Sequence, residues 1–129
     1  MATFRIGEAA TLLGVSADTV RRWIDAGRLK ATRDDNEHRV VDGADLAVFA
    51  RSLADSPEEG VGSSARNRFP GIVTNVVRDG VMAQVEVQAG PFRVVSLMSR
   101  EAADELALAV GSLVVAVVKS TNVVVELPR

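Results

Sequence analysis

The sequence predicts an α+β protein of two small domains, the first mainly helical and the second built from β-strands. Two observations support this prediction. Apolar residues recur at helical spacing up to about residue 54 and at alternating, strand-like spacing after residue 63. A polar stretch without apolar period, "SLADSPEEGVGSSA", lies between the two patterns and contains Pro57, Gly60 and Gly62. We therefore expect domains over residues 1–54 and 64–129, joined by a linker over residues 55–63.

The composition limits the possible functions. The chain has 129 residues, a formal net charge of −2, one histidine and no cysteine. The net charge gives no argument for nucleic-acid binding, and the lack of cysteine excludes disulfides and thiolate metal sites. No apolar run reaches membrane-spanning length, and the first residues lack the basic and apolar segments of a leader. We expect a cytoplasmic protein without a metal site.

The first domain is expected to begin with two helices separated by a short turn. Four apolar residues at i, i+3, i+4 and i+7 predict one buried face of the first helix, and Gly14 is its expected left-handed cap. These residues are Ile6, Ala9, Ala10 and Leu13. The second helix is expected to begin after Ser16 as N-cap, to run to about Ala26 and to stop at Gly27. Its inner face carries Val20, Trp23 and Ile24.

A hairpin and a third helix complete the first domain. The segment "RLKATRDDNEHRVV" has a turn-forming centre at residues 34–36 with short extended pieces on both sides, which predicts a β-hairpin, or wing. Asp42 is the expected cap of the third helix. The inner face of that helix has the same helical spacing, with Leu46, Phe49, Ala50 and Leu53. Two helices, a turn and a hairpin are the layout of a winged helix-turn-helix.

The outer side of the second helix carries a local positive charge. The segment from residue 21 to residue 33 contains five cations and only Asp25 as an acidic residue. Arginine and lysine position phosphates, and arginine also reads guanine edges in the major groove. The predicted DNA-contacting residues are Ser16, Thr19, Arg21, Arg22, Arg28, Lys30 and Arg39. The alternative is that these cations form only a solvated helix face.

The first domain also resembles a known family. The core pattern "EAA..LGVS..TVRRW...GRL" is similar to the excisionase or MerR-like winged helix-turn-helix family. This resemblance implies DNA binding through the helix from Ser16 to Ala26, supported by the wing. His38, the only histidine, has no second histidine or cysteine near it, so a metal role is not expected.

The second domain is expected to form a small β-barrel of the oligonucleotide-fold type. An Asp-Gly turn at Asp79 and Gly80 lies between the strands "GIVTNVV" and "VMAQVEV". In the second of these strands, Val81, Ala83, Val85 and Val87 are expected to face the core.

Three further strands and a helix follow in the second domain. "PFRVVSLMS" predicts a third strand, and "REAADELAL" predicts a brief helix capped by Ser99. "SLVVAVVKSTNVVVEL" predicts two more strands, broken near residues 120–122, of which the first is apolar on both faces and expected to be buried on both. Five strands and one helix give the predicted barrel.

Two polar clusters stand at the edges of these apolar strands. "SARN" combines Ser64 with Arg66, and "KST" combines Lys119 with Ser120 and Thr121. Hydroxyls and backbone N–H groups beside a cation suit an oxyanion with several acceptor oxygens, and neither stretch contains a carboxylate. Residues of this kind also occur as ordinary turn formers and solubilising charges. The residues alone therefore predict a site for a small oxyanion.

The same blocks resemble a known family. "SARNRFPGIV", "SREAADELAL" and "AVVKSTNVVVE" are similar, in this order, to the Mop domain of molbindins, a TOBE-like module. The resemblance implies a five-stranded barrel that assembles from several copies and binds molybdate or tungstate between subunits, without an organic cofactor. It implies an anion site formed by Ser64, Ala65, Arg66, Asn67, Ser99, Lys119 and Ser120. Members commonly have a serine where this chain has Ala102.

Together these features predict a cytoplasmic, molybdate- or tungstate-binding, DNA-binding transcriptional regulator that forms a homo-oligomer, dimer-based or hexameric. The alternative is a molybdate storage or buffering protein whose helical domain serves assembly or partner docking. The chain has neither a phosphate-binding loop motif nor a nucleophile elbow, so an enzyme is not expected.

Overall fold

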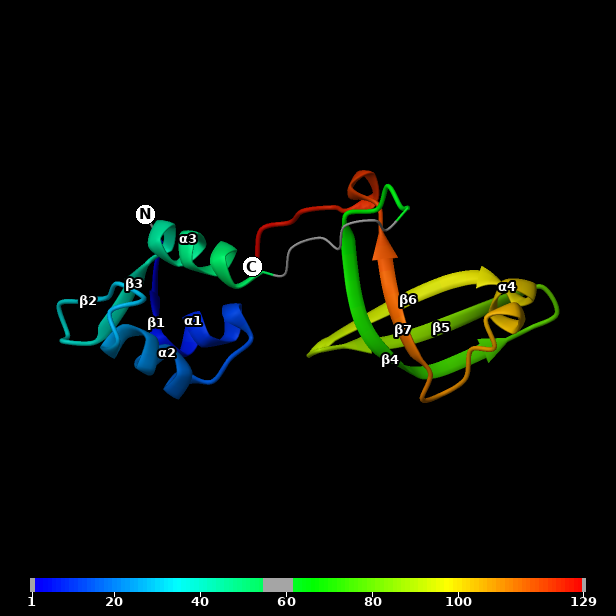
Figure 1. Ribbon diagram of the computed structural model, residues 1–129, viewed down its shortest axis with the longest axis horizontal. Coiled ribbons are helices and arrows are strands. Elements are labelled where there is room, and N and C mark those ends of the chain that lie inside the picture. Colours follow the sequence, from blue (N-terminus) through cyan, green and yellow to red (C-terminus); the bar gives the residue numbers. More distant parts are fainter. Residues whose placement is uncertain (1, 55–61, 129) are drawn as a thin grey trace. The chain divides into compact units, whose positions relative to one another are not determined.

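The computed structural model describes residues 2–54 and 62–128. The chain divides into two compact units, Met1–Ser56 and Pro57–Arg129 (Figure 1). Most of the predicted linker, residues 55–61, lies outside the described residues. In the described parts of the chain, no helix is both long and apolar enough to span a membrane.

The first unit consists of three helices and a small antiparallel sheet. Its elements are β1 (Thr3–Arg5), α1 (Ile6–Leu13), α2 (Ala17–Asp25), β2 (Thr32–Arg33), β3 (Arg39–Asp42) and α3 (Gly43–Leu53). The strands pair in the order β1-β3-β2. The three predicted helices and the predicted hairpin are confirmed. Strand β1 is an addition, because three residues are too short for an alternating pattern to be recognised.

Local capping explains where these helices begin and end. The Ser16 hydroxyl accepts a hydrogen bond from the Thr19 N–H at 3.2 Å, so that α2 begins at the next residue. The Asp42 carboxylate accepts from the N–H groups of Ala44 and Asp45 and caps α3 in the same way. Gly14 takes the left-handed conformation, with φ of 70°, and ends α1. The predicted caps are therefore confirmed.

The first unit encloses its own core. Ala9, Val20 and Val41 are fully buried, and they join α1 and α2 to strand β3. The Trp23 and Phe49 rings pack at the edge of this core with centroids 5.0 Å apart and planes at 60°. One expected core residue differs: Leu53, at the last position of α3, is 39% exposed.

The second unit is a curled antiparallel sheet with one short helix (Figure 1). Its elements are β4 (Asn67–Arg78), β5 (Met82–Ala89), β6 (Phe92–Ser99), α4 (Arg100–Glu105), β7 (Leu113–Val118) and a 3₁₀ helix (Ser120–Asn122). The strand order is β6-β5-β4-β7. The predicted Asp-Gly turn joins β4 to β5, and the Ser99 hydroxyl caps α4 by accepting from the Ala102 N–H at 3.0 Å.

Alternation along β5 places one face in the core, as expected. Ala83, Val85 and Val87 are buried, and Val73 from β4 packs with them. Val81 is wrong in the predicted set, because it lies in the turn before β5 and is 73% exposed. The Asp79 carboxylate accepts from the Val81 N–H, which places this residue in the turn rather than in the strand.

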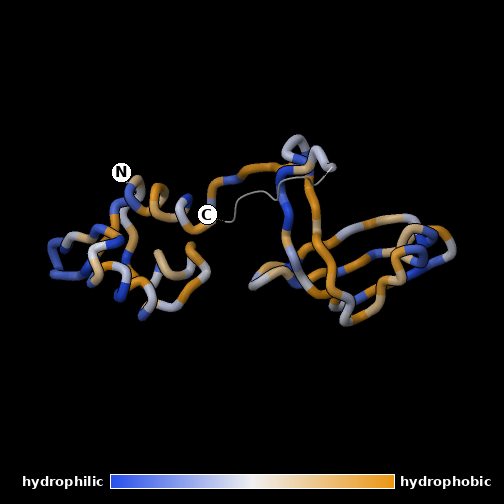
Figure 2. Tube along the Cα trace, viewed as in Figure 1, coloured by the Kyte–Doolittle hydropathy of each residue, from blue (hydrophilic) through white to orange (hydrophobic). Residues whose placement is uncertain are grey.

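The predicted fifth strand is absent from the described residues. The sheet has four strands, and residues 123–128 pair with none of them. The final segment is rich in valine, which favours a strand, but a strand also needs a neighbour that takes its backbone hydrogen bonds. The expected burial of β7 on both faces is also wrong: β7 pairs with β4, but one of its faces stays uncovered among the described residues, with Leu113 87% exposed and Val115 43%. Figure 2 shows this final segment as largely apolar.

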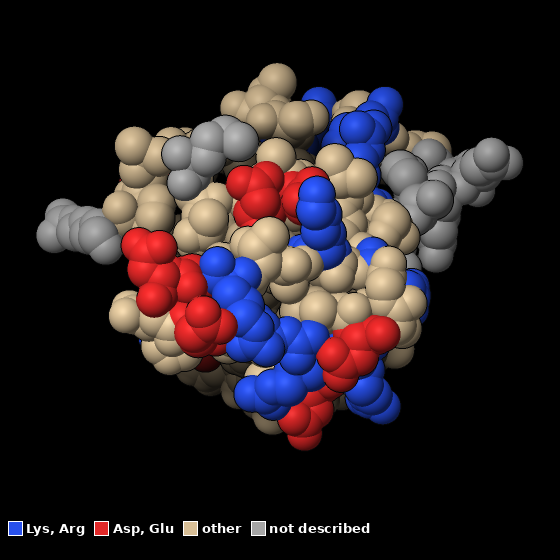
Figure 3. Space-filling model, turned by 90° about the vertical axis from the view of Figure 1, so that its left-hand side faces the viewer, with Lys and Arg blue, Asp and Glu red and all other residues tan. Residues whose placement is uncertain are grey.

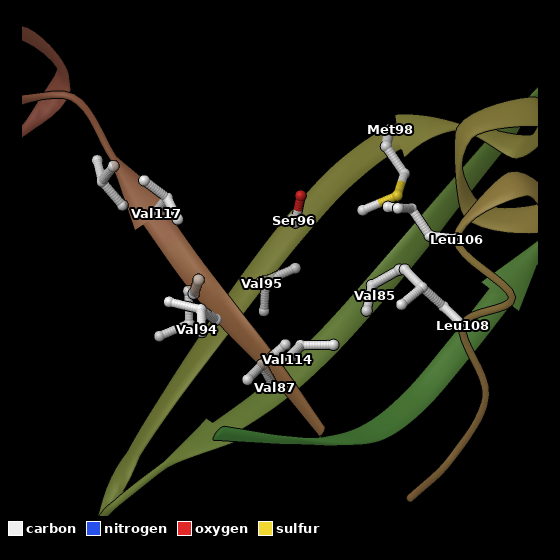
Figure 4. Close-up of a pocket in the computed structure, with 13 residues that line it drawn as sticks. Val85, Val87, Val94, Val95, Ser96, Met98, Leu106, Leu108, Val114 and Val117 are labelled. Atoms are coloured by element: carbon white, nitrogen blue, oxygen red, sulfur yellow. The ribbon is translucent and has the colours of Figure 1, made fainter. Parts of the chain in front are cut away.

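An apolar groove lies between the two edge strands, β6 and β7, where the sheet does not close (Figure 4). Its volume is about 330 Å³. It is lined mainly by valines of β5, β6 and β7, together with Met98, Leu106 and Leu108. Ser96 contributes a hydroxyl, and no lining residue is charged. The groove is therefore unsuited to an anion.

Candidate oxyanion site and nucleic-acid interface

Two of the three predicted anion-binding blocks meet at one end of the sheet. Strands β4 and β7 are antiparallel neighbours, with Asn67 opposite Val118. The Asn67 side-chain amide donates to the Val118 carbonyl oxygen at 3.0 Å. The start of β4 therefore lies beside the end of β7, and Ser64–Asn67 lie next to Lys119 and Ser120. These two segments are called the SARN–KS cluster below.

The SARN–KS cluster is accessible and rich in donors. Ser64, Arg66, Lys119 and Ser120 are exposed, whereas Ala65 and Asn67 are half-buried. Arg66 donates to the Ser63 carbonyl oxygen at 3.2 Å, which holds its side chain near its own loop. Within the described residues, neither cation of the cluster has a carboxylate within 4.0 Å. Two exposed cations without a carboxylate partner among the described residues, and two exposed hydroxyls, therefore lie at this end of the sheet.

The backbone of the cluster is partly committed to local hydrogen bonds. The Ala65 N–H donates to the Ser63 hydroxyl oxygen at 3.2 Å, so this predicted amide donor already has a partner. Lys119 is the N-cap of the 3₁₀ helix Ser120–Asn122 and makes no side-chain capping bond. The turn that follows β7 therefore places Lys119 and Ser120 without using the lysine side chain.

Ser99 lies away from this cluster. Ser99 is the last residue of β6 and lies opposite Met82, the first residue of β5. That end of β5 pairs with the Arg78 end of β4. Asn67 lies at the other end of β4, which is 12 residues long. The shallow depression beside Ser99 is lined by three carboxylates and one cation, namely Glu101, Asp104, Glu105 and Arg100, so its lining is net acidic. One chain therefore brings together two of the predicted blocks and leaves the third at the opposite end of the sheet.

Within the residues that the structure describes, no three histidine, cysteine, aspartate or glutamate side chains are grouped as metal ligands would be. His38 lies in the wing, where its Nδ1 atom contacts an Arg5 guanidinium nitrogen. Asp34 accepts backbone N–H groups of Asn36 and His38, both at 2.9 Å. These hydrogen bonds, that from His38 foremost, lower the pKa of Asp34 below its usual value.

Several of the predicted DNA-contacting cations on the first unit have partners. On α2, Arg21 pairs with Asp18 at 2.7 Å, and Arg22 donates to the Thr19 hydroxyl at 3.2 Å. Arg39, from β3, pairs with Asp25 at 2.7 Å. Figure 3 shows lysine and arginine side chains interleaved with aspartate and glutamate, rather than a purely basic patch.

The remaining predicted contacts lie after α2. The Arg28 guanidinium carbon is 6.0 Å from the centroid of the Phe49 ring, at the outer limit of a cation–π contact. Lys30 is exposed and has no carboxylate within 4.0 Å among the described residues. Ser16 is engaged as a cap, and its hydroxyl lies 2.9 Å from that of Thr19. Among the described residues, Arg22, Arg28 and Lys30 are therefore the predicted cationic DNA contacts that are exposed and have no carboxylate within 4.0 Å.

The two carboxylates that pair with Arg21 and Arg39, namely Asp18 and Asp25, were not assigned from the sequence. The spacing of Asp18 and Arg21, three residues apart on a helix, was a sufficient signal for the first pair. The second pair joins residues 14 positions apart through the tertiary fold, so no local pattern could have indicated it.

Comparison with known protein families assigns both units. Residues 3–54 match the model of the "Helix-turn-helix domain" family, and residues 63–125 match that of the "TOBE domain" family. The chain therefore joins a helix-turn-helix domain to a TOBE domain. The finer assignment of the helix-turn-helix domain to the excisionase or MerR-like group stays a prediction.

Two solved structures are similar to the TOBE domain. One is a molybdate-binding protein from Sporomusa ovata, 27% identical, with a TM-score of 0.49, covering 51% of this chain and 98% of that protein. The other is MopII from Clostridium pasteurianum, 34% identical, with a TM-score of 0.48, covering 51% of this chain and 100% of MopII. Among curated proteins, none matches the chain.

Proposed function

We propose that this protein is a DNA-binding transcriptional regulator that senses molybdate or tungstate. The observation that carries the proposal is the SARN–KS cluster, in a TOBE domain that follows a helix-turn-helix domain. The regulator acts in the cytoplasm, as a binding protein and not as an enzyme. Its ligand is the oxyanion itself, without an organic cofactor.

The chemistry of the cluster fits a small tetrahedral dianion. Arg66 and Lys119 supply two positive charges, and Ser64 and Ser120 supply hydroxyl donors for the remaining oxygens. Charge-assisted hydrogen bonds of this kind are about twice as strong as neutral ones. The Asn67 side-chain amide already donates to the Val118 carbonyl oxygen, so it holds the two strand ends together. The backbone N–H of Asn67 is the group proposed to lie near the anion.

The position of Ser99 supports a site between copies of the chain. Within one chain Ser99 stands at the far end of β4 from the SARN–KS cluster, so it can join that cluster only from another subunit. The exposed apolar residues of the TOBE domain support the same assembly. Leu113 is 87% exposed, Val124 82% and Val125 87%, and oligomerisation would cover such surfaces. The proposed assembly is a homo-oligomer, dimer-based or hexameric.

DNA binding is proposed for the helix-turn-helix domain, with α2 as the reading helix in the manner of excisionase or MerR-like proteins. Ser16 and Thr19 lie at the N-terminal end of α2, where backbone N–H groups favour phosphate. Arg22 and Lys30 supply charge that no described carboxylate neutralises. Arg21 and Arg28 complete the proposed contacts, and Arg39 belongs to the same surface through the wing.

A storage or buffering function is the second candidate. It is favoured by Asp18 and Asp25, which neutralise two arginines of the proposed DNA-binding surface. In that case the helix-turn-helix domain docks a partner or serves assembly, and DNA is not retained.

Calorimetric titration of the full-length protein with molybdate tests the anion site, with sulfate as the control ion. We expect molybdate to bind and sulfate to remain silent. Lys119→Ala should weaken molybdate binding about 10- to 100-fold, the effect of losing one charge-assisted hydrogen bond. Lys30→Ala is the matched control, because it removes an exposed lysine from the other domain. Equal affinity in Lys119→Ala and the wild type would contradict the proposed site.

A further inference from the structure

The Asp25–Arg39 ion pair connects two elements of the proposed DNA-binding surface. Asp25 is the last residue of α2, and Arg39 is the first residue of β3 in the wing. The Arg39 Nη2 atom donates to the Asp25 Oδ1 atom at 2.7 Å. The Arg39 side chain is 28% exposed, against 51% for Arg21. The side chain of Arg39 is therefore more buried in its ion pair than the side chain of Arg21.

The comparison with the other ion pair on α2 shows what this contact can do. Asp18 and Arg21 are three residues apart on the same helix, so their pair cannot influence the position of the wing. The Asp25–Arg39 pair spans the helix and the hairpin, and it can fix the angle between them. A fixed angle would let the wing and the reading helix meet one duplex together.

The strand register adds a second reason for the pair. Arg39 lies directly opposite Arg33 on β2, and like charges in that arrangement repel each other. Two features reduce the repulsion: the Asp25 carboxylate beside Arg39, and the Glu37 carbonyl oxygen, to which Arg33 donates at 2.6 Å. Without Asp25, the paired Arg33 and Arg39 would have no carboxylate within 4.0 Å among the described residues.

We propose that Arg39 is a positioning residue for DNA binding. Its guanidinium holds the wing against the C-terminal end of α2, and it neutralises a carboxylate that would otherwise face the phosphates. This inference rests on the proposed function, namely that the first domain binds DNA. It assigns to Arg39 an action through Asp25 and the wing rather than a phosphate contact of its own.

Charge reversal of the pair in the full-length protein tests this role. The wild type first selects a preferred duplex from a random-sequence pool, and affinities for that duplex and a scrambled duplex are then measured over a salt series. The variants are Arg39→Asp, Asp25→Arg and the double variant, which carries the same net charge as the wild type. Arg22→Gln serves as the control for a direct phosphate or base contact, and thermal melts show that each variant is folded.

A positioning role predicts that both single variants lose sequence preference, about tenfold or more. The loss in Asp25→Arg is the decisive one, because that variant gains positive charge. The sequence preference of the double variant should recover to within about threefold of the wild type, with an unchanged salt dependence.

A direct contact predicts the opposite: Asp25→Arg would bind at least as tightly, the double variant would stay weak, and Arg39→Asp would lower the salt slope by about 0.9. That result would overturn the proposal. Failure of the wild type to select any duplex would contradict DNA binding itself, and the positioning role with it.

Discussion

The two units differ in how completely each covers its own apolar residues. Among the described residues, three exposed large apolar side chains belong to the first unit and seventeen to the second. The first unit buries Ala9, Val20 and Val41 completely and joins its helices to a small sheet. In the second unit, the side chains of the final segment, residues 123–128, are exposed. The helix-turn-helix domain therefore covers most of its apolar residues by itself, whereas the TOBE domain leaves many of them exposed.

The reason for this difference lies in the kinds of element involved. A helix satisfies its backbone hydrogen bonds within itself and needs neighbours only for its apolar stripe. A strand needs neighbours for its backbone and for both faces. In the second unit β6 and β7 are edges, and an apolar groove separates them where a closed barrel would have a paired strand.

The largest expected effect comes from a charge on the final segment. Val124→Asp or Val125→Asp places a carboxylate on side chains that are 82% and 87% exposed in one chain. If these residues are covered in an oligomer, the buried charge prevents assembly. Light scattering after gel filtration should show the oligomer lost.

Val48→Asp is the matched control for this change. Val48 is 74% exposed on α3 of the first unit, so its replacement should leave assembly unchanged. If Val124→Asp and Val125→Asp assemble like the wild type, the second unit does not depend on its final segment in the way that the comparison of the units suggests.

A smaller effect is expected from a single methyl group within the second unit. A Cβ atom at Gly71 would lie 2.5 Å from the Gln88 carbonyl oxygen, because β4 and β5 approach each other closely there. Gly71→Ala should therefore destabilise the TOBE domain by about 1–3 kcal/mol, as overpacking does. Calorimetric unfolding should show its transition at a lower temperature.

Gly7→Ala offers the opposite case in the first unit. Its Cβ atom meets nothing within 4 Å, and Gly7 lies within α1, so alanine should stabilise the helix by up to about 1 kcal/mol. Equal and small effects of the two substitutions would mean that the close contact of β4 with β5 is relaxed in solution.

The smallest effect concerns acid, and it compares the hairpin turns of the two units. The Asp79 carboxylate accepts from the N–H groups of Met82 and Val81, and these bonds, that from Met82 foremost, lower the pKa of Asp79. Because this pKa is lower in the folded state than the unfolded value of about 3.9, the carboxylate stabilises the fold above that pH. The stabilisation is lost as the pH falls through the folded pKa. Asp34 behaves in the same way in the wing.

Thermal melts between pH 2 and pH 7 measure this contribution. Asp79→Asn should flatten the acid dependence of the second unit alone, and Asp34→Asn that of the first alone. An acid dependence that is the same in both variants and the wild type would show that these turns do not contribute to it.

Local signals explain which parts of the fold could be predicted from the sequence. Ser16, Gly14 and Asp42 act within one or two turns of the helices that they cap, so their roles were readable from spacing. The fifth strand was not: residues 123–127 are mostly apolar and rich in valine, which favours a strand, yet pairing depends on a neighbour that the described chain does not provide. The same distinction applies to the candidate sites. The register of β4 and β7 explains why Asn67 lies opposite Val118, whereas the contact of Asp25 with Arg39 depends on tertiary packing.

The proposed regulator requires the TOBE domain and the helix-turn-helix domain to act together, one sensing an oxyanion and the other binding DNA. The most direct test is the affinity of the full-length protein for its selected duplex with molybdate, with sulfate and with neither ion. We predict that molybdate changes this affinity at least about fivefold, the lower limit of typical coupling between sites, and that sulfate does not. The change should disappear in Lys119→Ala. Equal DNA affinity under all three conditions, in a protein that binds molybdate, would contradict the claim and favour the storage function.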